Sequence, residues 1–597
     1  MNQPLAPDPA ELARVFGDVA RQSSRILDDF LKRQSEHRNA PPPDEFGLAK
    51  AYMDLAANMF ANPYKTAAMQ INMFWDYMSL WQFSMARLSG GAPEPVASPI
   101  KGDNRFRDED WQNHFLFDYI KQSYLITSRH IQDSVANTEG LSDESRKKVN
   151  FFTRQYLDAM APSNFALTNP QVLRETAHSG GQNLLNGLSN LLGDIEGGDG
   201  ALHIRMTDPK AFAVGVNVAT TPGKVVFQND LMQLIQYDPM TKDVLKRPLL
   251  IMPPWINKFY ILDLREKNSF IRWAVLQGHT VFVISWVNPD ARFAGKGFED
   301  YMTEGPLAAI DAIALATGER HVNVIGYCLG GTLLGATLAY MAAKKDKRVA
   351  SASFLVSLLD FSIPGELGVF IDEAQVGALE KRMNERGYLE GREMAATFNL
   401  LRANDLVWSF VIHNYLLGKE PFPFDLLYWN SDSTRMPAAM HSFYLRNMYL
   451  NNLLKEPGGI ALCGVPIDLR KIKVPAYFVS TAEDHIAPWK STYKGAHLLA
   501  QAGDNTRFVL GGSGHIAGIV NPPAANRYGY WTHDALPESV DVWLEQAEHH
   551  EGSWWNDWQG WITSISDTKV PARQPGEGKL KVIEAAPGSY VSQRPAD

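Results

Sequence analysis

Six short apolar runs in the last two-thirds of the chain constrain its fold more than any other feature. Intervals long enough for helices separate them. Runs that are apolar on both faces are typical of a parallel sheet covered by helices. The runs span 248–252, 280–286, 321–327, 352–357, 476–480 and 507–510. The sequence therefore predicts an α/β domain, preceded by a hairpin of two strands at Lys224–Gln228 and Leu231–Ile235.

The third run leads into a sharp turn and then a helix expected from near Thr332. At the turn stands Gly326-Tyr-Cys328-Leu-Gly330, the G-x-S-x-G nucleophile elbow of the α/β-hydrolase fold with cysteine in place of serine. The glycines let strand and helix pass close together, and the helix N-terminus favours the reactive thiolate. Cys328 is therefore the candidate nucleophile. The alternative is a small buried side chain in a glycine-rich turn.

A nucleophile in this position needs a base and an orienting acid, in the chain order nucleophile, acid, base. Asp484 follows the fifth apolar run, and His515 lies in a glycine-rich loop after the sixth. The three side chains then come from the ends of three strands. We predict Cys328, Asp484 and His515 as a catalytic triad, with Glu483 and His485 as rivals one position to either side of the acid.

The same fold predicts where an oxyanion would be stabilised. The backbone amide of Leu329, next to the nucleophile, is one expected donor. The second should come from the loop Pro253–Lys258 after the first run, with the Ile256 amide as the first candidate and Trp255 as the second. Cys463, which has no acid or base pattern nearby, is interpreted as structural.

The domain organisation follows from changes of periodicity along the chain. The spacing of apolar residues over 1–200 predicts an all-helical N-terminal domain, beginning with an amphipathic pattern over 9–33. Residues 201–597 form the α/β domain. The interval 361–473 is far longer than a crossover needs, and we interpret it as a cap that limits access of water to the nucleophile. The tail, about 566–597, is expected to be loose.

The segment from about residue 45 to Leu88 is rich in methionine and aromatic residues and is helical apart from a break at Pro63. Two interpretations stay open. The side chains either fill an ordinary helical core or form an adaptable apolar surface for a partner or an amphiphilic particle. The tryptophans near residues 554–561 are assigned, as a guess, to the same kind of surface.

Composition excludes several function classes. The 597 residues are 45% hydrophobic and 21% charged, and the net charge of -9 comes without a basic run for nucleic acid. Two cysteines far apart fit a reducing cytoplasm rather than a disulfide scaffold. No signal pattern is visible, and no apolar run reaches the ~18 residues of a membrane span.

Cysteine at the elbow indicates acyl transfer. A serine enzyme forms an oxygen ester, whereas a cysteine enzyme forms a thioester that stays activated towards an alcohol. Under a cap that keeps water scarce, such a site suits transfer of an acyl group from one thioester to a hydroxyl acceptor.

Several motifs then identify a family. They are the elbow Gly326–Gly331, Asn164–Pro170, Pro253–Asp263, Asp425–Asp432, Ala482–Trp489, Gly514–Gly518 and Gly552–Trp558. Together they resemble the polyhydroxyalkanoate synthases, and the similarity runs from about residue 100 to about residue 565. Chain length and the single-chain layout resemble the class I enzymes. Residues 1–95 match no motif of the family.

The resemblance implies polymerisation of (R)-3-hydroxyacyl-CoA, chiefly 3-hydroxybutyryl-CoA, with release of coenzyme A. His515 is implied to activate Cys328, and Asp484 to help activate the 3-hydroxyl group that attacks the next thioester. It implies no metal or redox cofactor, because the coenzyme A thioester is itself the substrate. It also implies a homodimer acting in the cytoplasm at the surface of polymer granules, with granule-associated proteins as further partners.

Two alternatives remain on the sequence alone. A cysteine-dependent thioesterase or polyester depolymerase on the same fold would release free hydroxy acid and form no polymer. A granule-surface structural protein with an inactive hydrolase fold would bind particles without needing Cys328, Asp484 or His515.

Overall fold

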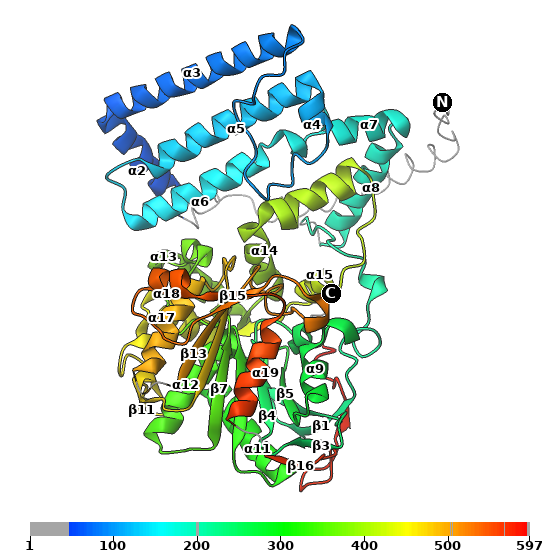
Figure 1. Cartoon of the computed structure of the whole chain (residues 1–597), viewed down its shortest axis with the longest axis vertical. Coiled ribbons are helices and arrows are strands. Elements are labelled where there is room, and N and C mark those ends of the chain that lie inside the picture. The colour runs from blue at the N-terminus through cyan, green and yellow to red at the C-terminus, as the bar shows by residue number, and fades with distance from the viewer. Residues whose placement is uncertain (1–46, 199–201, 502, 504, 566–567, 594–597) are drawn as a thin grey trace. The chain divides into compact units, whose positions relative to one another are not determined.

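The computed structural model describes residues 47–198, 202–501, 503, 505–565 and 568–593, so the pattern predicted over 9–33 lies outside the described residues. The chain divides into two compact units. The helical unit joins Met1–Asp208 to Thr397–Pro423, and the catalytic unit joins Pro209–Ala396 to Phe424–Asp597 (Figure 1). The segment 397–423, placed in the cap by the sequence analysis, thus belongs to the helical unit.

The helical unit is built from long helices whose ends follow local sequence signals. Its main helices are α2 (Leu48–Ala61), α3 (Pro63–Leu88), α5 (Phe115–Ala136), α6 (Asp143–Ala159), α7 (Pro170–His178) and α8 (Gln182–Glu196). Proline takes the first position of α3 and of α7, where its missing N–H costs nothing. The Asn169 side chain caps α7 by accepting hydrogen bonds from the amides of Gln171 (3.0 Å) and Val172 (3.2 Å).

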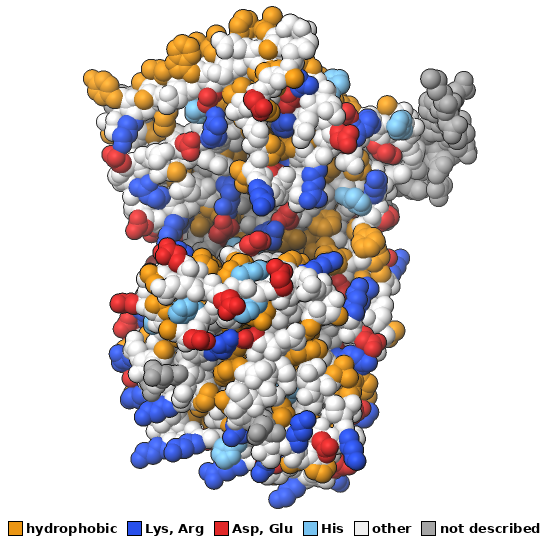
Figure 2. All heavy atoms as spheres, in the orientation of Figure 1, with side chains coloured by type: hydrophobic (Ala, Val, Ile, Leu, Met, Phe, Trp, Pro, Cys, Tyr) orange, Lys and Arg blue, Asp and Glu red, His pale blue; other side chains and the backbone are white. Residues whose placement is uncertain are grey.

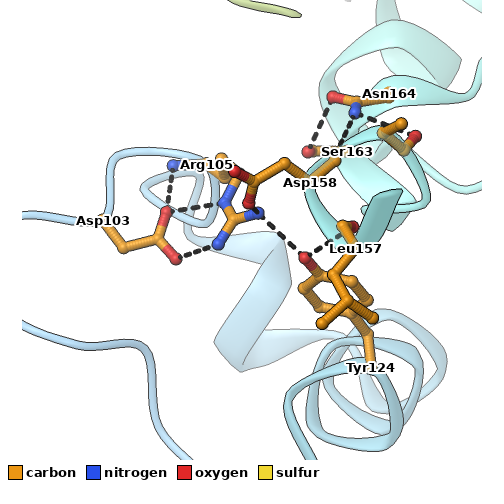
Figure 3. A network of polar contacts seen from close by, with 8 residues as sticks. Asp103, Arg105, Tyr124, Leu157, Asp158, Ser163 and Asn164 are labelled. Atoms are coloured by element: carbon orange, nitrogen blue, oxygen red, sulfur yellow. Dashed lines mark hydrogen bonds and ion pairs between the residues drawn. The ribbon is translucent and has the colours of Figure 1, made fainter. Parts of the chain in front are cut away.

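A half-buried arginine ties the segment before α4 (Asp110–Asn113) to two of these helices (Figure 3). The Arg105 guanidinium donates to Asp103, to the Tyr124 hydroxyl of α5 at 2.9 Å and to the Asp158 carboxylate of α6 at 3.0 Å. Tyr124 in turn donates to the Leu157 carbonyl at 3.0 Å. The planar, always charged guanidinium lets one side chain satisfy partners on three segments.

The methionine- and aromatic-rich helices leave much of their apolar surface in solvent. Hydrophobic side chains gather over α3 in Figure 2. The large exposed side chains on α2 and α3 are Tyr52, Met53, Phe60, Tyr64, Ile71, Phe74, Trp75, Trp81, Met85 and Leu88. Leu80 and Phe83 pack inward instead. No helix among the described residues combines the length and apolar character needed to cross a membrane.

The catalytic unit is organised by one eleven-stranded sheet, ordered β15-β14-β13-β12-β7-β6-β4-β5-β2-β1-β17. Its central strands are β4 (Leu249–Met252), β5 (Val281–Trp286), β6 (Val322–Tyr327), β7 (Val349–Leu355), β12 (Ala476–Thr481) and β13 (Thr506–Gly511), all parallel. These are the six apolar runs. The remaining strands are antiparallel and lie at the two edges: β1 (Gly223–Gln228), β2 (Met232–Tyr237), β14 (Tyr530–Thr532), β15 (Glu548–His550) and β17 (Glu584–Ala585). The predicted α/β-hydrolase sheet and the predicted hairpin are confirmed.

Helix α19 (Trp554–Ser564) covers one face of this sheet (Figure 1). Trp554, Trp555 and Trp558 are at most 1% exposed and belong to the main core cluster. The Trp558 indole also donates to the Ser353 hydroxyl of β7 at 2.9 Å. The guess that these tryptophans form an outer surface is wrong, because they fill the layer between helix and sheet.

The chain beyond α19 adds strands at two places. β16 (Lys569–Pro571) pairs with β3 (Asp243–Leu245), and β17 pairs with β1 at the edge of the large sheet. Residues 568–593 are therefore joined to the catalytic unit by strand pairing, whereas a loose tail was expected from the sequence. The local sequence has few apolar residues, and its order comes from these long-range pairings.

The cap interval also supplies helices to the catalytic unit. They are α13 (Glu373–Arg386), α15 (Asp425–Ser431) and α16 (Ala438–Tyr444), and α16 continues as a wider helical turn over Leu445–Leu450. Asn452 anchors the end of this segment. Its amide donates to Asp360 at 2.9 Å and its carbonyl oxygen accepts from the Phe361 amide at 2.8 Å.

Replacement of Trp558 by alanine tests the role of α19 in the core. It removes a fully buried ring and its hydrogen bond, so we expect the free energy of unfolding to fall by about 3–5 kcal/mol. Trp75→Ala, at a side chain that is 61% exposed, is the control and should change it by less than about 0.5 kcal/mol. Chemical denaturation followed by circular dichroism measures both; equal effects would contradict the assignment.

Candidate active site

Cys328 occupies the turn between β6 and α12 (Leu329–Ala343). Its backbone has φ 52° and ψ −119°, a conformation that costs a non-glycine residue of order 1–3 kcal/mol. Three hydrogen bonds hold it there. The Cys328 amide donates to the Leu355 carbonyl of β7 at 2.8 Å, and the Cys328 carbonyl accepts from the amides of Gly331 (2.9 Å) and Thr332 (3.2 Å).

The glycines of the elbow are required by close approach of backbone to backbone. A β-carbon on Gly326 would lie 2.5 Å from the Cα of Gly331. One on Gly330 would lie 2.1 Å from the carbonyl oxygen of Met252, at the end of β4. Neither contact is possible between real atoms, so the strand, the turn and the helix can meet at Cys328 only with glycine at these positions.

Asp484 and His515 come together as the sequence predicted. The His515 Nδ1 atom lies 2.7 Å from Asp484 Oδ2, and the carboxylate has no exposed side-chain surface. The other carboxylate oxygen accepts from the amides of Ile486 (2.9 Å) and Ala487 (2.8 Å). The His515 ring also hydrogen-bonds to the half-buried Cys328 side chain. The three predicted residues therefore form one continuous chain of contacts.

The backbones of the two rivals for the acid contact other segments. Glu483 is exposed, and its amide donates to the Ser513 carbonyl at 2.9 Å. The backbone carbonyl of His485 accepts from the Glu366 amide at 3.4 Å. The Asp484 carboxylate, by contrast, contacts the His515 ring directly.

The charges around His515 favour its protonated form. Burial by itself would lower the pKa of the imidazole, but the Asp484 carboxylate and the Cys328 sulfur raise that pKa from 6.5 to about 10. The ring is then an imidazolium at neutral pH. An imidazolium bonded to sulfur stabilises the thiolate, the form of cysteine that attacks a carbonyl carbon.

The candidate oxyanion donors come from two segments, the start of α12 and the loop after β4. Leu329 begins α12, and its amide has no hydrogen-bond acceptor within the part of the chain that the structure describes. The amides of Trp255 and Ile256 also have none there, whereas their carbonyls are held by Thr434, through its hydroxyl (2.8 Å) and its amide (3.4 Å). These three N–H groups stay the predicted donors. In the described residues no cluster of histidine, cysteine and acidic side chains is suited to hold a metal ion.

Comparison with known proteins decides the family. The chain is 47% identical to the poly(3-hydroxyalkanoate) polymerase subunit PhaC of Rhizobium meliloti, over 99% of this chain and 96% of that protein. It is 47% identical to the poly(3-hydroxyalkanoate) polymerase of Methylorubrum extorquens over 99% of both chains. With the polymerase subunit of Cupriavidus necator it shares 42% identity over 91% of both chains. The chain belongs to the poly(3-hydroxyalkanoate) polymerase family.

Two family descriptions match this polymerase, over ranges that overlap at residues 255–274. The poly-beta-hydroxybutyrate polymerase (PhaC) N-terminus matches residues 102–274, and the alpha/beta hydrolase fold matches residues 255–522. The second range contains the whole elbow, Asp484 and His515. The resemblance noted from the sequence motifs is thus confirmed at the level of the family.

Sequence reasoning missed two tyrosines that the cap brings to the site of the polymerase. Tyr444 and Tyr449 lie close enough to Cys328 that a negative charge on its sulfur adds to the effect of burial in raising the pKa of both phenols. The Tyr444 hydroxyl also hydrogen-bonds with Tyr449 and Thr332. Both phenols stay neutral and can donate a hydrogen bond near the sulfur. The sequence shows both tyrosines, but only the fold brings them near Cys328.

Alkylation by iodoacetamide tests the thiolate–imidazolium pair in a Cys463→Ser background, which removes the exposed second thiol. Because the pKa of His515 is about 10, the imidazolium persists from pH 6 to pH 9 and alkylation of Cys328 should stay fast at pH 6.5. His515→Gln should slow it by about 10- to 100-fold at pH 6.5, as for an ordinary thiol with a pKa near 8.5.

The difference in alkylation rate between the parent and His515→Gln should disappear as the pH rises to about 9.5, where an ordinary thiol is itself ionised. The alkylation rates are measured by mass spectrometry of the peptide that contains Cys328. Equal rates at pH 6.5 would show that His515 does not act on the sulfur.

Proposed function

We propose that the chain polymerises (R)-3-hydroxyacyl groups, chiefly 3-hydroxybutyryl, from their coenzyme A thioesters, with Cys328 carrying the acyl group. Family membership supports the reaction class, since the relatives are named poly(3-hydroxyalkanoate) polymerases. The observation that carries the residue assignment is the chain of contacts from Cys328 through His515 to Asp484.

The first half-reaction loads the enzyme. The Cys328 thiolate attacks the carbonyl carbon of the incoming thioester, and the amides of Leu329 and of Ile256 or Trp255 stabilise the oxyanion. When the intermediate collapses, the bond to the coenzyme A sulfur breaks and the His515 imidazolium gives its proton to that sulfur. The acyl group is left on Cys328 as a thioester, and His515 is left neutral.

The second half-reaction joins two units. Neutral His515, oriented by Asp484, takes the proton from the 3-hydroxyl group of a second coenzyme A thioester while that hydroxyl oxygen attacks the acyl carbonyl on Cys328. An ester bond forms and the bond to the Cys328 sulfur breaks, which restores the imidazolium–thiolate pair and leaves the lengthened acyl chain on coenzyme A, ready to be loaded again. Asp484 also stabilises the developing charge on the imidazolium, and by its position it helps to activate the hydroxyl.

The choice of sulfur suits this reaction rather than hydrolysis. A thioester on Cys328 is higher in free energy than the ester product, so transfer to an alcohol is downhill. Tyr444, which is buried, and the partly buried Tyr449 lie near the sulfur, where their rings reduce the room for water. This argument favours the polymerase over a thioesterase or depolymerase with the same triad.

The setting of the reaction is part of the proposal. We place the enzyme in the cytoplasm at the surface of polymer granules, as a homodimer. The exposed apolar side chains of α2 and α3 support binding to such a surface, since contiguous apolar patches of this kind mark interaction sites (Figure 2). The substrate is the coenzyme A thioester, and the proposed steps use no metal or redox cofactor.

Purified protein with (R)-3-hydroxybutyryl-CoA tests this function. We expect coenzyme A release together with insoluble polyester, and Cys328→Ala should lower the rate of release by about 10³-fold or more. Cys463→Ser is the matched control and should keep the parental rate. Release of free 3-hydroxybutyrate without polymer would instead indicate a thioesterase, and release that survives in Cys328→Ala would contradict the assignment of the nucleophile.

A further inference from the structure

Lys258 is a buried cation in the loop that carries the candidate oxyanion amides of Trp255 and Ile256. Its side chain is only 1% exposed, and its ammonium nitrogen lies 3.9 Å from the Asp432 carboxylate. The same nitrogen donates to the carbonyls of Val591 at 2.8 Å and Gln593 at 2.6 Å. A buried ammonium needs such acceptors, because transfer out of water without them is costly. The far end of the chain therefore helps to hold this loop.

The segment that supplies these carbonyls is fixed to the edge of the sheet. β17 pairs with β1, and two flanking hydrogen bonds extend the pairing, Ile583 N–H to the Val225 carbonyl (2.8 Å) and Ala586 N–H to the Gly223 carbonyl (2.9 Å). Val591 is 1% exposed and belongs to the main core cluster. The segment 584–593, here named the C-terminal strap, is thus anchored at both ends.

Gln233 of β2 fixes the middle of the strap. Its fully buried amide donates to the Ser589 hydroxyl at 3.0 Å and to the Glu584 carboxylate, and it accepts from the Tyr590 amide at 3.1 Å. Gly588 passes against this side chain with φ +85°, and a β-carbon there would lie 2.4 Å from the Gln233 amide oxygen. A side chain at 588 would therefore be strained by its backbone conformation and would have to displace the Gln233 amide.

The oxyanion loop is held on its other side by the segment 429–434. The Trp429 indole donates to the Lys258 carbonyl at 2.8 Å, and Thr434 holds the carbonyls of Trp255 and Ile256. These contacts fix the backbone from one side, while the strap fixes the Lys258 side chain from the other.

We propose that the C-terminal strap, acting through Lys258, sets the position of the oxyanion loop, so that a segment more than 300 residues downstream contributes to the rate of acyl transfer. Lys258 is a positioning residue, since its ammonium group faces the strap and Asp432 rather than the sulfur. The proposal rests on the proposed function in assuming that an amide of this loop stabilises the oxyanion. Such a donor must sit within hydrogen-bond distance of the oxyanion, and a displacement of about 1 Å can cost about 100-fold in rate.

Two variants of the full-length chain loosen the strap in different ways. Lys258→Met removes the charge and both hydrogen bonds but keeps the length of the side chain. Gly588→Ala pushes the strap off Gln233 and leaves Lys258 intact. Gly576→Ala is the matched control, because it has a similar φ of +89° in the same tail, yet the atom nearest to its β-carbon would be a methyl carbon of Val582, at 3.0 Å.

Three measurements on these variants separate positioning from general damage. We expect kcat for coenzyme A release to fall by about 10- to 100-fold in Lys258→Met and Gly588→Ala, with KM changed by less than about threefold. Alkylation of Cys328 by iodoacetamide needs no oxyanion hole, so its rate should stay within about twofold of the parent. Hydrogen exchange in peptides covering 253–260 should become faster in both variants and stay unchanged in Gly576→Ala.

Parental kcat together with parental exchange in a folded Lys258→Met or Gly588→Ala protein would overturn the proposal. So would a loss of Cys328 alkylation that matches the loss of kcat, because the damage would then lie at the nucleophile. If Lys258→Met does not fold, Gly588→Ala decides the outcome. If the parent itself releases no coenzyme A, the proposed function fails, while the exchange measurement still decides whether the strap holds the loop.

Discussion

The turn at Cys328 is the constraint on which the rest of the catalytic unit depends. A left-handed backbone at a residue with a side chain is unfavourable, and it persists only because the neighbouring structure enforces it. Here β7 supplies an acceptor for the Cys328 amide, and α12 begins at once with amides that bind the Cys328 carbonyl. On the other side of the turn, the last carbonyl of β4 lies so close to Gly330 that no side chain fits there. The sulfur is thus placed by the packing of three strands and one helix, and not by a flexible loop.

The electrostatics of the site follow from that placement. A buried imidazole on its own would be neutral, because burial penalises the charged form. His515 instead carries its proton at neutral pH, since it lies between the Asp484 carboxylate and the Cys328 sulfur. In the proposed first half-reaction the leaving coenzyme A sulfur needs a proton, and this ring holds one. One protonated ring can therefore serve the resting state and the first half-reaction.

Sequence reasoning worked where the signal was local. The six parallel strands could be read from their apolar runs, and the elbow from five consecutive residues, because strand burial and backbone crowding leave a mark at the positions concerned. The order of acid and base along the chain was enough to predict that Asp484 and His515 are in contact. Their chemical roles stay predictions. In each case the residues that act together follow from the order of the strands.

Contacts between distant segments could not be predicted in this way. Lys258 and Val591 are 333 residues apart, and nothing in the tail sequence indicates that its carbonyls satisfy a buried ammonium. The tail therefore looked loose. The tryptophans of α19 looked like a surface motif for the same reason, because only the sheet beneath them shows that they are core residues. The cap tyrosines and the assignment of 397–423 to the helical unit likewise depend on tertiary folding.

The central claim, that a single sulfur carries the acyl group in an activated form, is tested most directly with butyryl-CoA. This thioester can acylate the nucleophile but lacks the 3-hydroxyl group needed for chain growth. Mass spectrometry of the digested protein should find one butyryl group, on the peptide containing Cys328, removable by hydroxylamine as a thioester is. A butyryl group found on any other side chain, or none at all while coenzyme A is released, would contradict the account.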